Sequence, residues 1–440
     1  MATGGAPLQF DHLIDTLRET VSRFHDRRTG TNTRYSISDV ALSAFSVFFM
    51  QSPSFLDFQR TMGRNKGRHN AASLFGVREV PCDNQIRSLL DAVAAESLDP
   101  VFDAVLEQLG ATGVLDEFRS IGGDLLVTLD GTEYYRSGRI SCDQCHVTHH
   151  SNGSVSYKHM LIAPAVVRAG RKDVVVLAPE FIRSSDGASK AENEISAAKR
   201  WLHRMGERLS PLSVTIMGDD LYASQPFLSL VGEFEMNFLC ICKPQSHKYL
   251  QQCIDSHRAC GELERLSTTE WTGKEHRTTV YEWIEDVPIR SSEDAMQVGW
   301  LNVRVSAEDG HTIYHNSFIT NHRLTAESVV DIAAAGRARW KVENEDINTL
   351  KTKGYNLEHN FGHGTEHLCE TLATLNILAF LFHTLLDLSD KRYQLLRTTR
   401  GRRTRFFAEL GTVACYWYHD SWQELMRFMV TQLELPDPGG

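Results

Sequence analysis

Carboxylates follow two apolar runs of the chain at the point where each run ends. "LVTLDG" leads into Asp130, and "TIMGDD" leads into Asp219 and Asp220. Short apolar runs of this kind predict buried β-strands, and in open α/β sheets ligands bind beyond the carboxyl ends of the strands. Asp-Gly is also a common turn pair, so a turn is the alternative for each Asp taken singly.

A third group of acids lies in "RARWKVENEDINTLK", which reads as a helix. At about 100° per residue, Glu343 shares one stripe with Ile347 and Leu350. Glu345 falls roughly opposite, and Asp346 lies about 60° from the stripe. If the apolar stripe packs on the sheet, Glu343 is carried toward it, where an acid is costly unless it is paired or bound to metal. We therefore expect Glu343 to be the functional acid, with Asp346 as the second choice and Glu345 in solvent.

Three carboxylates that converge on one edge repel one another, so they are a poor structural device. They suit hard divalent cations, which prefer oxygen ligands. Two Mg²⁺ or Mn²⁺ ions about 3.5–4 Å apart can activate a water or a 3′-hydroxyl and stabilise the leaving oxygen of a phosphoryl transfer. The pattern therefore indicates a metal-dependent phosphoryl-transfer site.

The elements that must position these acids follow a definite order. Residues 1–118 read as amphipathic helices, and from residue 124 three strands are followed by helix, strand, helix and strand. Residues 255–318 are β-rich, and helical character returns at about residue 324 and continues nearly to the end. The sequence predicts an α/β core with helical regions at both ends.

Composition and charge restrict the class of protein. The chain has 440 residues, of which 42% are hydrophobic and 23% charged, as is typical of a soluble globular protein. Its formal net charge of −10 argues mildly against nucleic-acid binding over the whole surface. The segment "KRYQLLRTTRGRRTR" nevertheless holds seven Lys and Arg residues and no acid. Closely spaced Arg suits DNA phosphates; a charged surface linker is the alternative.

Cysteine usage and the N-terminus indicate the compartment. The nine cysteines are scattered, and the first residues have neither the basic start nor the apolar core of a signal peptide. The most apolar stretch, residues 371–388, is interrupted by Asn376 and His383. We expect it to be a buried helix rather than a membrane span, and the protein to be cytoplasmic.

The stretch "CDQCHVTHH" is a candidate for a second kind of metal site. It offers Cys142 and Cys145, with His146, His149 or His150 nearby. A Cys-x-x-Cys beside histidines can bind zinc, although no second pair at a matching distance is obvious in the sequence. We consider Cys142, Cys145 and His149 as zinc ligands, with a loop of reduced thiols as the alternative.

The blocks "LVTLDGTEY", "TIMGDDLY" and "RARWKVENEDINTLK", taken together, resemble the signature blocks of the DDE transposases of bacterial insertion sequences. The similarity covers about residues 120–390 and is to the cut-and-paste class with a β-rich insertion. It implies an RNase-H-like α/β fold with a mixed sheet. The division it implies is a helical region over 1–118 that is a candidate for binding DNA ends, the first part of the catalytic domain over 119–250, a β-rich insertion over 251–322, the catalytic helix and completion of the core over 323–390, and a basic, then helical, region over 391–440.

By this resemblance, the catalytic and metal-binding triad is Asp130, Asp219 and Glu343. In the second block the family has an Asp three residues before a Tyr, so Tyr222 selects Asp219 over Asp220. The metals implied are two Mg²⁺ or Mn²⁺ ions.

The third block also implies DNA contacts. In the family it is often Tyr, two residues, Arg, three residues, Glu, six residues and Lys. Arg339 and Glu343 keep this spacing, whereas Gly336 occupies the Tyr position and Lys351 comes one residue late. Arg339 and Lys351 are expected to contact DNA phosphates, and Trp340 either stacks on a base or packs, which we favour. The basic segment adds three candidates for contacts to the DNA backbone: Arg400, Arg402 and Arg403.

The activity implied is nicking of DNA at the ends of the element, followed by attack of the freed 3′-hydroxyl on DNA. The implied partners are double-stranded DNA, at the element ends and the target, and a second copy of the chain in a homodimer on paired ends, at the nucleoid of a bacterium. Two alternatives stay open. One is a nuclease of the same fold without strand transfer, and the other is a decayed copy that binds DNA without catalysis, against which the intact triad argues.

Overall fold

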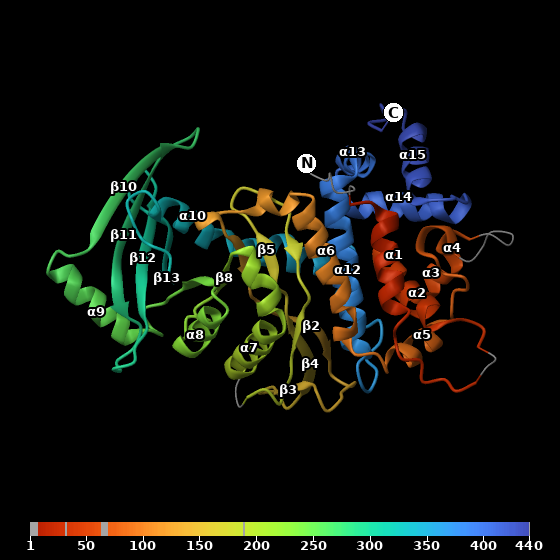
Figure 1. Cartoon of the computed structure of the whole chain (residues 1–440), viewed down its shortest axis with the longest axis horizontal. Helices are drawn as coiled ribbons and strands as arrows, with labels where there is room; N and C mark the ends of the chain where they lie inside the picture. The colour runs from red at the N-terminus through yellow and green to blue at the C-terminus, as the bar shows by residue number, and fades with distance from the viewer. Residues whose placement is uncertain (1–7, 31–32, 63–68, 188–189, 440) are drawn as a thin grey trace.

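The structure is a computed structural model that describes residues 8–30, 33–62, 69–187 and 190–439. The side chains of residues 190–192 and 342–343 also lie outside the description, and Glu343 is among them. A large mixed sheet forms the centre, and helices from both ends of the chain gather on one side of it (Figure 1). The prediction of a mixed α/β protein with helical ends is confirmed.

Nine strands form the main sheet, in the spatial order β10-β11-β12-β13-β9-β8-β1-β5-β6. β8 runs parallel to β1 and to β9, and the other pairings in the sheet are antiparallel. Every residue of β1 and β8 is buried, as expected for parallel strands covered on both faces. The strands are β1 (Leu125–Thr128), β5 (Ala165–Val167), β6 (Val175–Val176), β8 (Val214–Gly218), β9 (Asn237–Ile241), β10 (Glu264–Trp271), β11 (His276–Pro288), β12 (Gln297–Ser306) and β13 (Thr312–Thr320).

The β-rich segment after β9 continues the main sheet. β13 pairs with β9 through Phe318 and Ile241, and β12, β11 and β10 follow outward in antiparallel hairpins. These strands form the end of the molecule that lies opposite the N- and C-terminal helices (Figure 1).

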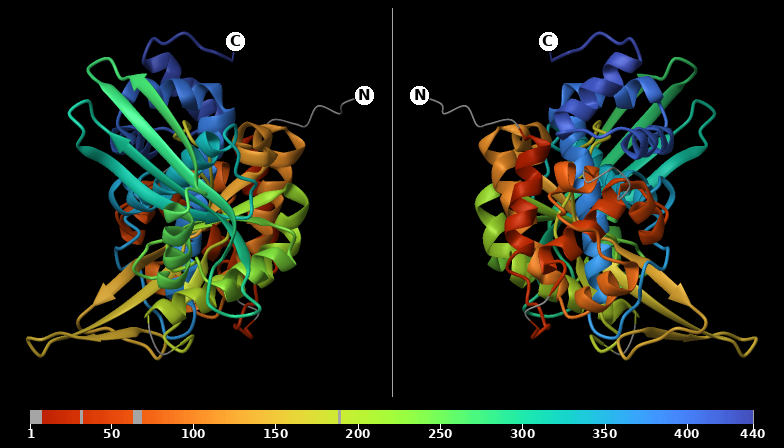
Figure 2. Two further views of the ribbon diagram at one scale, coloured as in Figure 1. Left: turned by 90° about the vertical axis from the view of Figure 1, so that its left-hand side faces the viewer. Right: turned by 90° about the vertical axis from the view of Figure 1, so that its right-hand side faces the viewer.

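A smaller sheet lies below the main one and projects from the body as an arm (gold, at the bottom of both views in Figure 2). It contains β2 (Gly131–Ser137), β4 (Val155–Ile162) and β3 (His146–His149), and β7 (Glu180–Ile182) pairs with β4. The β-rich stretch 154–167 is therefore divided between two sheets. Its first part is β4 of the arm and its second part is β5 of the main sheet, with Pro164 between them.

Helices cover the sheets and form the two end regions. The N-terminal region contains α1 (Phe10–Val21), α2 (Ile37–Phe49), α3 (Phe55–Met62), α4 (Asn70–Phe75), α5 (Asp83–Leu90) and α6 (Asp99–Ala111). The core adds α7 (Lys190–Leu209), α8 (Gln225–Glu233), α9 (Lys248–Ala259), α10 (Val329–Ala338), the π-helix Val342–Ile347 and α11 (Asn348–Thr352). The C-terminal region contains α12 (Leu368–Ser389), α13 (Lys391–Arg400), α14 (Arg403–Tyr416) and α15 (Trp422–Gln432).

Helix α12 is the apolar stretch that the sequence singles out. It is long and apolar enough to cross a membrane, but 89% of its apolar window is buried inside the protein. Phe382 packs edge-on against Phe45 of α2 at 5.1 Å between ring centroids. Each of its polar interruptions makes one hydrogen bond inside the protein, because Nδ1 of His383 lies 2.6 Å from the Tyr355 hydroxyl and the Asn376 amide donates to the Tyr355 carbonyl. The helix is a core element, as the sequence predicts.

The π-helix and α11 together form one helix, the site helix, which ends at Thr352. Loop 353–367 joins this helix to α12, and Asp91 holds the end of the loop next to α12. Oδ1 of Asp91 accepts backbone N–H groups from Glu366 at 3.0 Å and Leu368 at 3.1 Å, and the Thr365 hydroxyl donates to Oδ2. These bonds satisfy donors at the start of α12 that have no partner within the helix. The N-terminal region thereby fixes the point at which α12 begins.

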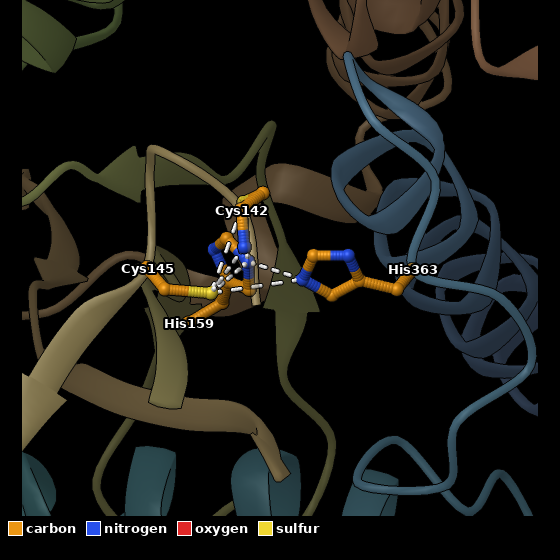
Figure 3. A group of neighbouring side chains, drawn as sticks. All are labelled: Cys142, Cys145, His159 and His363. Atoms are coloured by element: carbon orange, nitrogen blue, oxygen red, sulfur yellow. Dashed lines mark hydrogen bonds between the residues drawn. The ribbon is translucent and has the colours of Figure 1, made fainter. Parts of the chain in front are cut away.

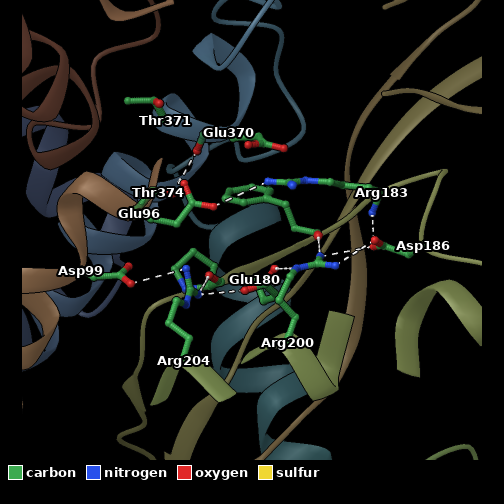
Figure 4. Close-up of polar contacts among 12 residues, drawn as sticks. Glu96, Asp99, Glu180, Arg183, Asp186, Arg200, Arg204, Glu370, Thr371 and Thr374 are labelled. Carbon is green, nitrogen blue, oxygen red and sulfur yellow. Dashed lines mark hydrogen bonds and ion pairs between the residues drawn. The ribbon is translucent and has the colours of Figure 1, made fainter. Parts of the chain in front are cut away.

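A network of ion pairs joins the N-terminal region to the core (Figure 4). Arg204 of α7 lies 3.1 Å from Glu180 and 3.4 Å from Asp99 of α6, and Arg200 lies 2.6 Å from Glu180. Glu180 and Asp99 are buried, and buried carboxylates are stable only when they are paired in this way. The network therefore fixes α6 against the α7 face of the core.

Candidate functional site

Asp130 and Asp219 lie side by side at one edge of the main sheet. β1 and β8 are parallel, with Thr128 beside Met217. The Leu129 N–H donates to the Met217 carbonyl at 2.8 Å, so the pairing continues past the end of β1. Each Asp lies two residues beyond this pair, and both are half-buried. The structure thus brings together two of the three acids that the sequence singles out.

The next residue, Asp220, has different partners. Its Oδ1 accepts the Lys243 N–H at 2.5 Å, and its Oδ2 accepts the hydroxyl of Ser246, in the loop after β9. Asp219 instead accepts the Leu221 N–H at 2.9 Å, which closes its own turn. Asp220 therefore anchors a loop, and Asp219 is the acid placed at the sheet edge.

Glu194 of α7 is a fourth acid at this edge, which the sequence analysis missed. It is buried, and its Oε1 accepts a hydrogen bond from the Tyr222 hydroxyl at 3.0 Å. Burial raises the pKa of Tyr222 well above its usual value, and the charges of Glu194, Asp130 and Asp219 raise it further. Gly131 leaves room for this carboxylate, since a Cβ there would lie 2.6 Å from it. In "KAENEIS" Glu194 looks like any helical surface acid, and only the glycine that follows Asp130 is a signal.

Asp346 supplies a fully buried carboxyl group from the site helix. It lies in the π-helix Val342–Ile347, at 0% exposure, and neither oxygen has a hydrogen-bond partner among the described residues. Burial, and then the charge of Asp130, raise the pKa of Asp346 well above its usual value. The backbone of Glu343 belongs to the same π-helix, while its side chain lies outside the described residues. Glu345, expected in solvent, is half-buried and lines a groove.

The donor set suits divalent cations. A buried carboxyl group with two oxygens that lack partners is rare in proteins unless an ion or a special chemistry accounts for it. Asp346 is such a group, and its electrostatic neighbour is Asp130, which is beside Asp219. Oxygen ligands of this kind are those that Mg²⁺ and Mn²⁺ prefer. Among the described residues, the carboxyl groups of Asp130, Asp219 and Asp346 are the donors of this kind at the edge.

The π-helix explains the late position of Lys351. A π-turn adds one residue to an α-helix and occurs often at functional sites, so the extra residue before Lys351 is accommodated within Val342–Ile347. Lys351 is 2.8 Å from Glu358. Burial raises the pKa of the Cys240 thiol to about 12, with the charge of Asp219 also raising it and the charge of Arg339, just before the π-helix, lowering it. Arg339 therefore lies near the edge of the main sheet that holds Asp130 and Asp219, the carboxylate edge.

Trp340 does not pack in the core, contrary to the interpretation that we favoured. Its side chain is 49% exposed, and Nζ of Lys341 lies 5.5 Å from its ring centroid. Lys341 is itself buried and donates to the carbonyl of Arg171. The Trp340 ring is thus displayed on the surface, with Lys341 over it.

A groove of about 740 Å³ runs along the other side of the site helix. Glu345 and Thr349 line it, whereas Asp130 and Asp219 do not. Basic side chains outnumber acids on its walls. The bases are Lys172, Lys353, Arg397, Arg402 and Arg403, and the acids are Asp173, Glu345 and Asp387.

The three arginines predicted to bind DNA have different surroundings. Arg402 is exposed at the groove. Arg400 is paired with Glu409 at 2.5 Å. Arg403 donates to the Tyr355 hydroxyl at 2.9 Å and lies 3.4 Å from Asp387, with only 15% of its side chain exposed. Arg403 is therefore a structural cation, and Arg402 is the one placed to meet a ligand.

Cys142 and Cys145 lie together, but their histidine partners differ from the expectation. Ligand atoms of Cys142, Cys145, His159 and His363 all lie within 4.8 Å of one another. His149 is exposed at the end of β3 and is not part of this group. β3 pairs antiparallel with β4, which brings His146, not His149, opposite Lys158 next to His159. The missed histidines come from β4 and from "FGHG" in the loop before α12.

Comparisons with known proteins give little direct help. No family model matches the chain, and no curated protein matches it significantly. Among solved structures, the chain is similar to a piggyBac transposase in a synaptic complex with hairpin DNA, at 11% identity and a TM-score of 0.36. That match covers 98% of this chain and 84% of the other. At this level of similarity, function has to be argued from the site itself.

Proposed function

We propose that this chain is a metal-dependent DNA transposase of the insertion-sequence type with an RNase-H-like catalytic core. The strand order β6-β5-β1-β8-β9 supports the RNase-H-like core. The antiparallel strands β5 and β6 flank β1 on one side, and the parallel strands β8 and β9 flank it on the other. The similarity of the three acidic blocks to DDE transposases supports the chemistry. DNA nicking and 3′-hydroxyl transfer is then the activity of the carboxylate edge.

The observation that carries the proposal is the buried carboxyl group of Asp346, without a hydrogen-bond partner among the described residues and next to Asp130, at the edge where Asp219 ends β8. Asp130, Asp219 and the acids of the π-helix, Glu343 and Asp346, would hold two Mg²⁺ or Mn²⁺ ions. When bound, such ions activate the attacking oxygen and stabilise the leaving oxygen.

The residues around the carboxylates would bind and orient the DNA. Arg339, near the carboxylate edge, would hold a phosphate, and the exposed Trp340 ring would stack on a base beside it. The groove would guide the backbone past the outer side of the site helix, with Arg402 and Lys353 on its walls. This confines the positive charge to one face, which is compatible with an acidic chain overall.

The test is cleavage of a labelled duplex that carries the element's own end, with Mg²⁺ or Mn²⁺. Asp130→Asn and Asp219→Asn should abolish cutting and strand joining, while Asp220→Asn and Glu345→Gln should retain them. Glu343→Gln and Asp346→Asn then decide which acid of the π-helix is required. Calorimetric titration with Mn²⁺ gives a second readout, since loss of a ligand should weaken binding of the ion even without DNA.

Three outcomes separate the proposal from its alternatives. Cutting without joining of the 3′-hydroxyl indicates a nuclease. DNA binding without cutting in the wild-type protein indicates a decayed copy. Equal cutting by wild type, Asp130→Asn and Asp219→Asn contradicts the site itself. Sedimentation of the protein on paired ends tests the homodimer.

A further inference from the structure

Two thiols and two imidazoles converge outside the carboxylate site. They come from two neighbouring parts of the smaller sheet and from one distant part of the chain (Figure 3). Cys142 and Cys145 lie in the turn between β2 and β3, His159 is on β4, and His363 is in loop 353–367. His159 and His363 are separated by 204 positions, yet their Nε2 atoms are 3.0 Å apart.

Five of the six separations among the four atoms are close to those of ligands around one tetrahedral ion, and the sixth, between Cys142 and His363, is within 4.8 Å. Bonds of about 2.3 Å to sulfur and about 2.05 Å to nitrogen, at tetrahedral angles, place two sulfurs about 3.8 Å apart, a sulfur and a nitrogen about 3.5 Å apart, and two nitrogens about 3.3 Å apart. The two sulfurs here are 3.7 Å apart. Nε2 of His159 lies 3.5 Å from Cys142 and 3.3 Å from Cys145, and Nε2 of His363 lies 3.7 Å from Cys145.

His363 is held in the orientation that a metal needs. Nδ1 of His363 lies 2.9 Å from the Gly364 carbonyl and donates to it, which leaves the lone pair on Nε2 facing the cluster. Cys142 and Cys145 do not form a disulfide, because their sulfur atoms are 3.7 Å apart and a sulfur–sulfur bond is about 2.05 Å long.

We propose that Cys142, Cys145, His159 and His363 bind one zinc ion. Four protein ligands close a tetrahedral site, and closed sites of this kind are structural rather than catalytic. The ion would tie the arm of the smaller sheet to loop 353–367, which follows the site helix. Its function is to hold the arm and the site helix in one arrangement.

The surroundings fit a structural site. The Tyr135 ring packs 4.8 Å from His363 and 5.6 Å from His159, centroid to centroid. Tyr134 is buried beside the same histidine at 5.9 Å. These rings limit the access of water to the four ligands, which favours a stable ion over an exchangeable one.

The experiment measures zinc in the purified full-length protein by atomic emission. Wild type should carry roughly one zinc ion per chain. Cys145→Ser and His363→Ala should lose it, and His149→Ala, an exposed histidine from the same motif, should retain it. His363→Cys is a matched rescue, since a thiolate is also a zinc ligand. Replacement of zinc by Co²⁺ gives a visible spectrum that reports tetrahedral coordination and sulfur ligation.

Zinc in wild type, His149→Ala and His363→Cys, but not in His363→Ala, supports the site. Wild-type protein that takes up neither Zn²⁺ nor Co²⁺ overturns it, as does a His149→Ala variant that loses the ion. Far-UV circular dichroism of each variant separates ligand loss from unfolding. None of these readouts depends on DNA cleavage, so the outcome is independent of the proposed function.

Discussion

The Tyr222 hydroxyl donates a hydrogen bond to Oε1 of Glu194 at 3.0 Å, inside the protein and directly beside the carboxylate edge. The bond links the turn after β8 to helix α7. It gives a physical role to the tyrosine that selects Asp219 in the second block. The tyrosine fixes a buried acid next to Asp130 and Asp219, and with it the charge of the edge.

Removal of this bond should affect both stability and activity. Tyr222→Phe keeps the ring but leaves the Glu194 carboxylate buried without its donor, which we expect to cost about 1–3 kcal/mol in the free energy of unfolding. Urea unfolding of the wild type, Tyr222→Phe, Glu194→Gln and the double variant measures the coupling between the two residues. Strictly additive effects would contradict the bond.

The size of residue 131 should matter more for the site than for the fold. A Cβ at Gly131 would lie 2.6 Å from the Glu194 carboxylate, so Gly131→Ala must displace that acid. We expect DNA cleavage to fall by about tenfold or more, with a loss of stability of about 1–3 kcal/mol. Gly138→Ala, at the end of the same hairpin, is the control, because its nearest neighbour would be 3.9 Å away.

Two adjacent arginines should behave in opposite ways. Arg402→Ala, at the exposed wall of the groove, should weaken DNA binding and reduce the slope of log affinity against log salt by about 1, with little change in stability. Arg403→Ala should destabilise the fold by about 1–3 kcal/mol, because it removes the donor to the buried Tyr355 hydroxyl and one of the two arginines, with Arg397, that lie beside the half-buried Asp387. Filter binding at several salt concentrations and thermal unfolding of both variants give the comparison. Equal salt slopes for Arg402→Ala and wild type would contradict the prediction that DNA binds along the groove.

The buried Glu370 of α12 should make stability depend on pH. Burial raises its pKa to about 7, Arg183 and Arg200 lower it, and Glu96 and Glu180 raise it. Because the folded pKa is above the unfolded value of 4.5, the contribution to stability is complete below about pH 4.5 and is lost as pH rises through about 7. Glu370→Gln should remove this change, on the order of 3 kcal/mol, from unfolding curves measured between these two pH values. An unchanged pH profile would show that Glu370 stays ionised in the fold.

Local patterns were enough to predict that Asp130 and Asp219 meet at one edge. Each follows a short, fully buried strand, and parallel neighbouring strands deliver the residues that follow them to the same edge of the sheet. The main sheet and the helical ends followed from the same hydrophobic periodicity. The strand pattern did not show that β10 to β13 extend the main sheet, since pairing with β9 is a long-range contact.

The residues that the sequence analysis missed are those that only the tertiary fold brings to the two sites. Glu194 and Gly131 are far apart in sequence, and a helical glutamate carries no local sign of burial. His363 approaches His159 because loop 353–367 folds back onto the arm, whereas His149 is close in sequence but is exposed and lies outside the cluster. The π-helix was equally hidden, because a helix with one extra residue has the composition of an ordinary helix.

Loop 353–367 has consequences for motion as well as position. It begins at the site helix, carries His363 of the metal cluster, and ends where Asp91 caps α12. A segment with anchors at both ends and in the middle opens as a cooperative unit rather than residue by residue. In native-state hydrogen exchange, the amides of α11, the loop and the first turn of α12 should therefore exchange with one common free energy of opening. Withdrawal of the metal should lower that free energy for all of them together.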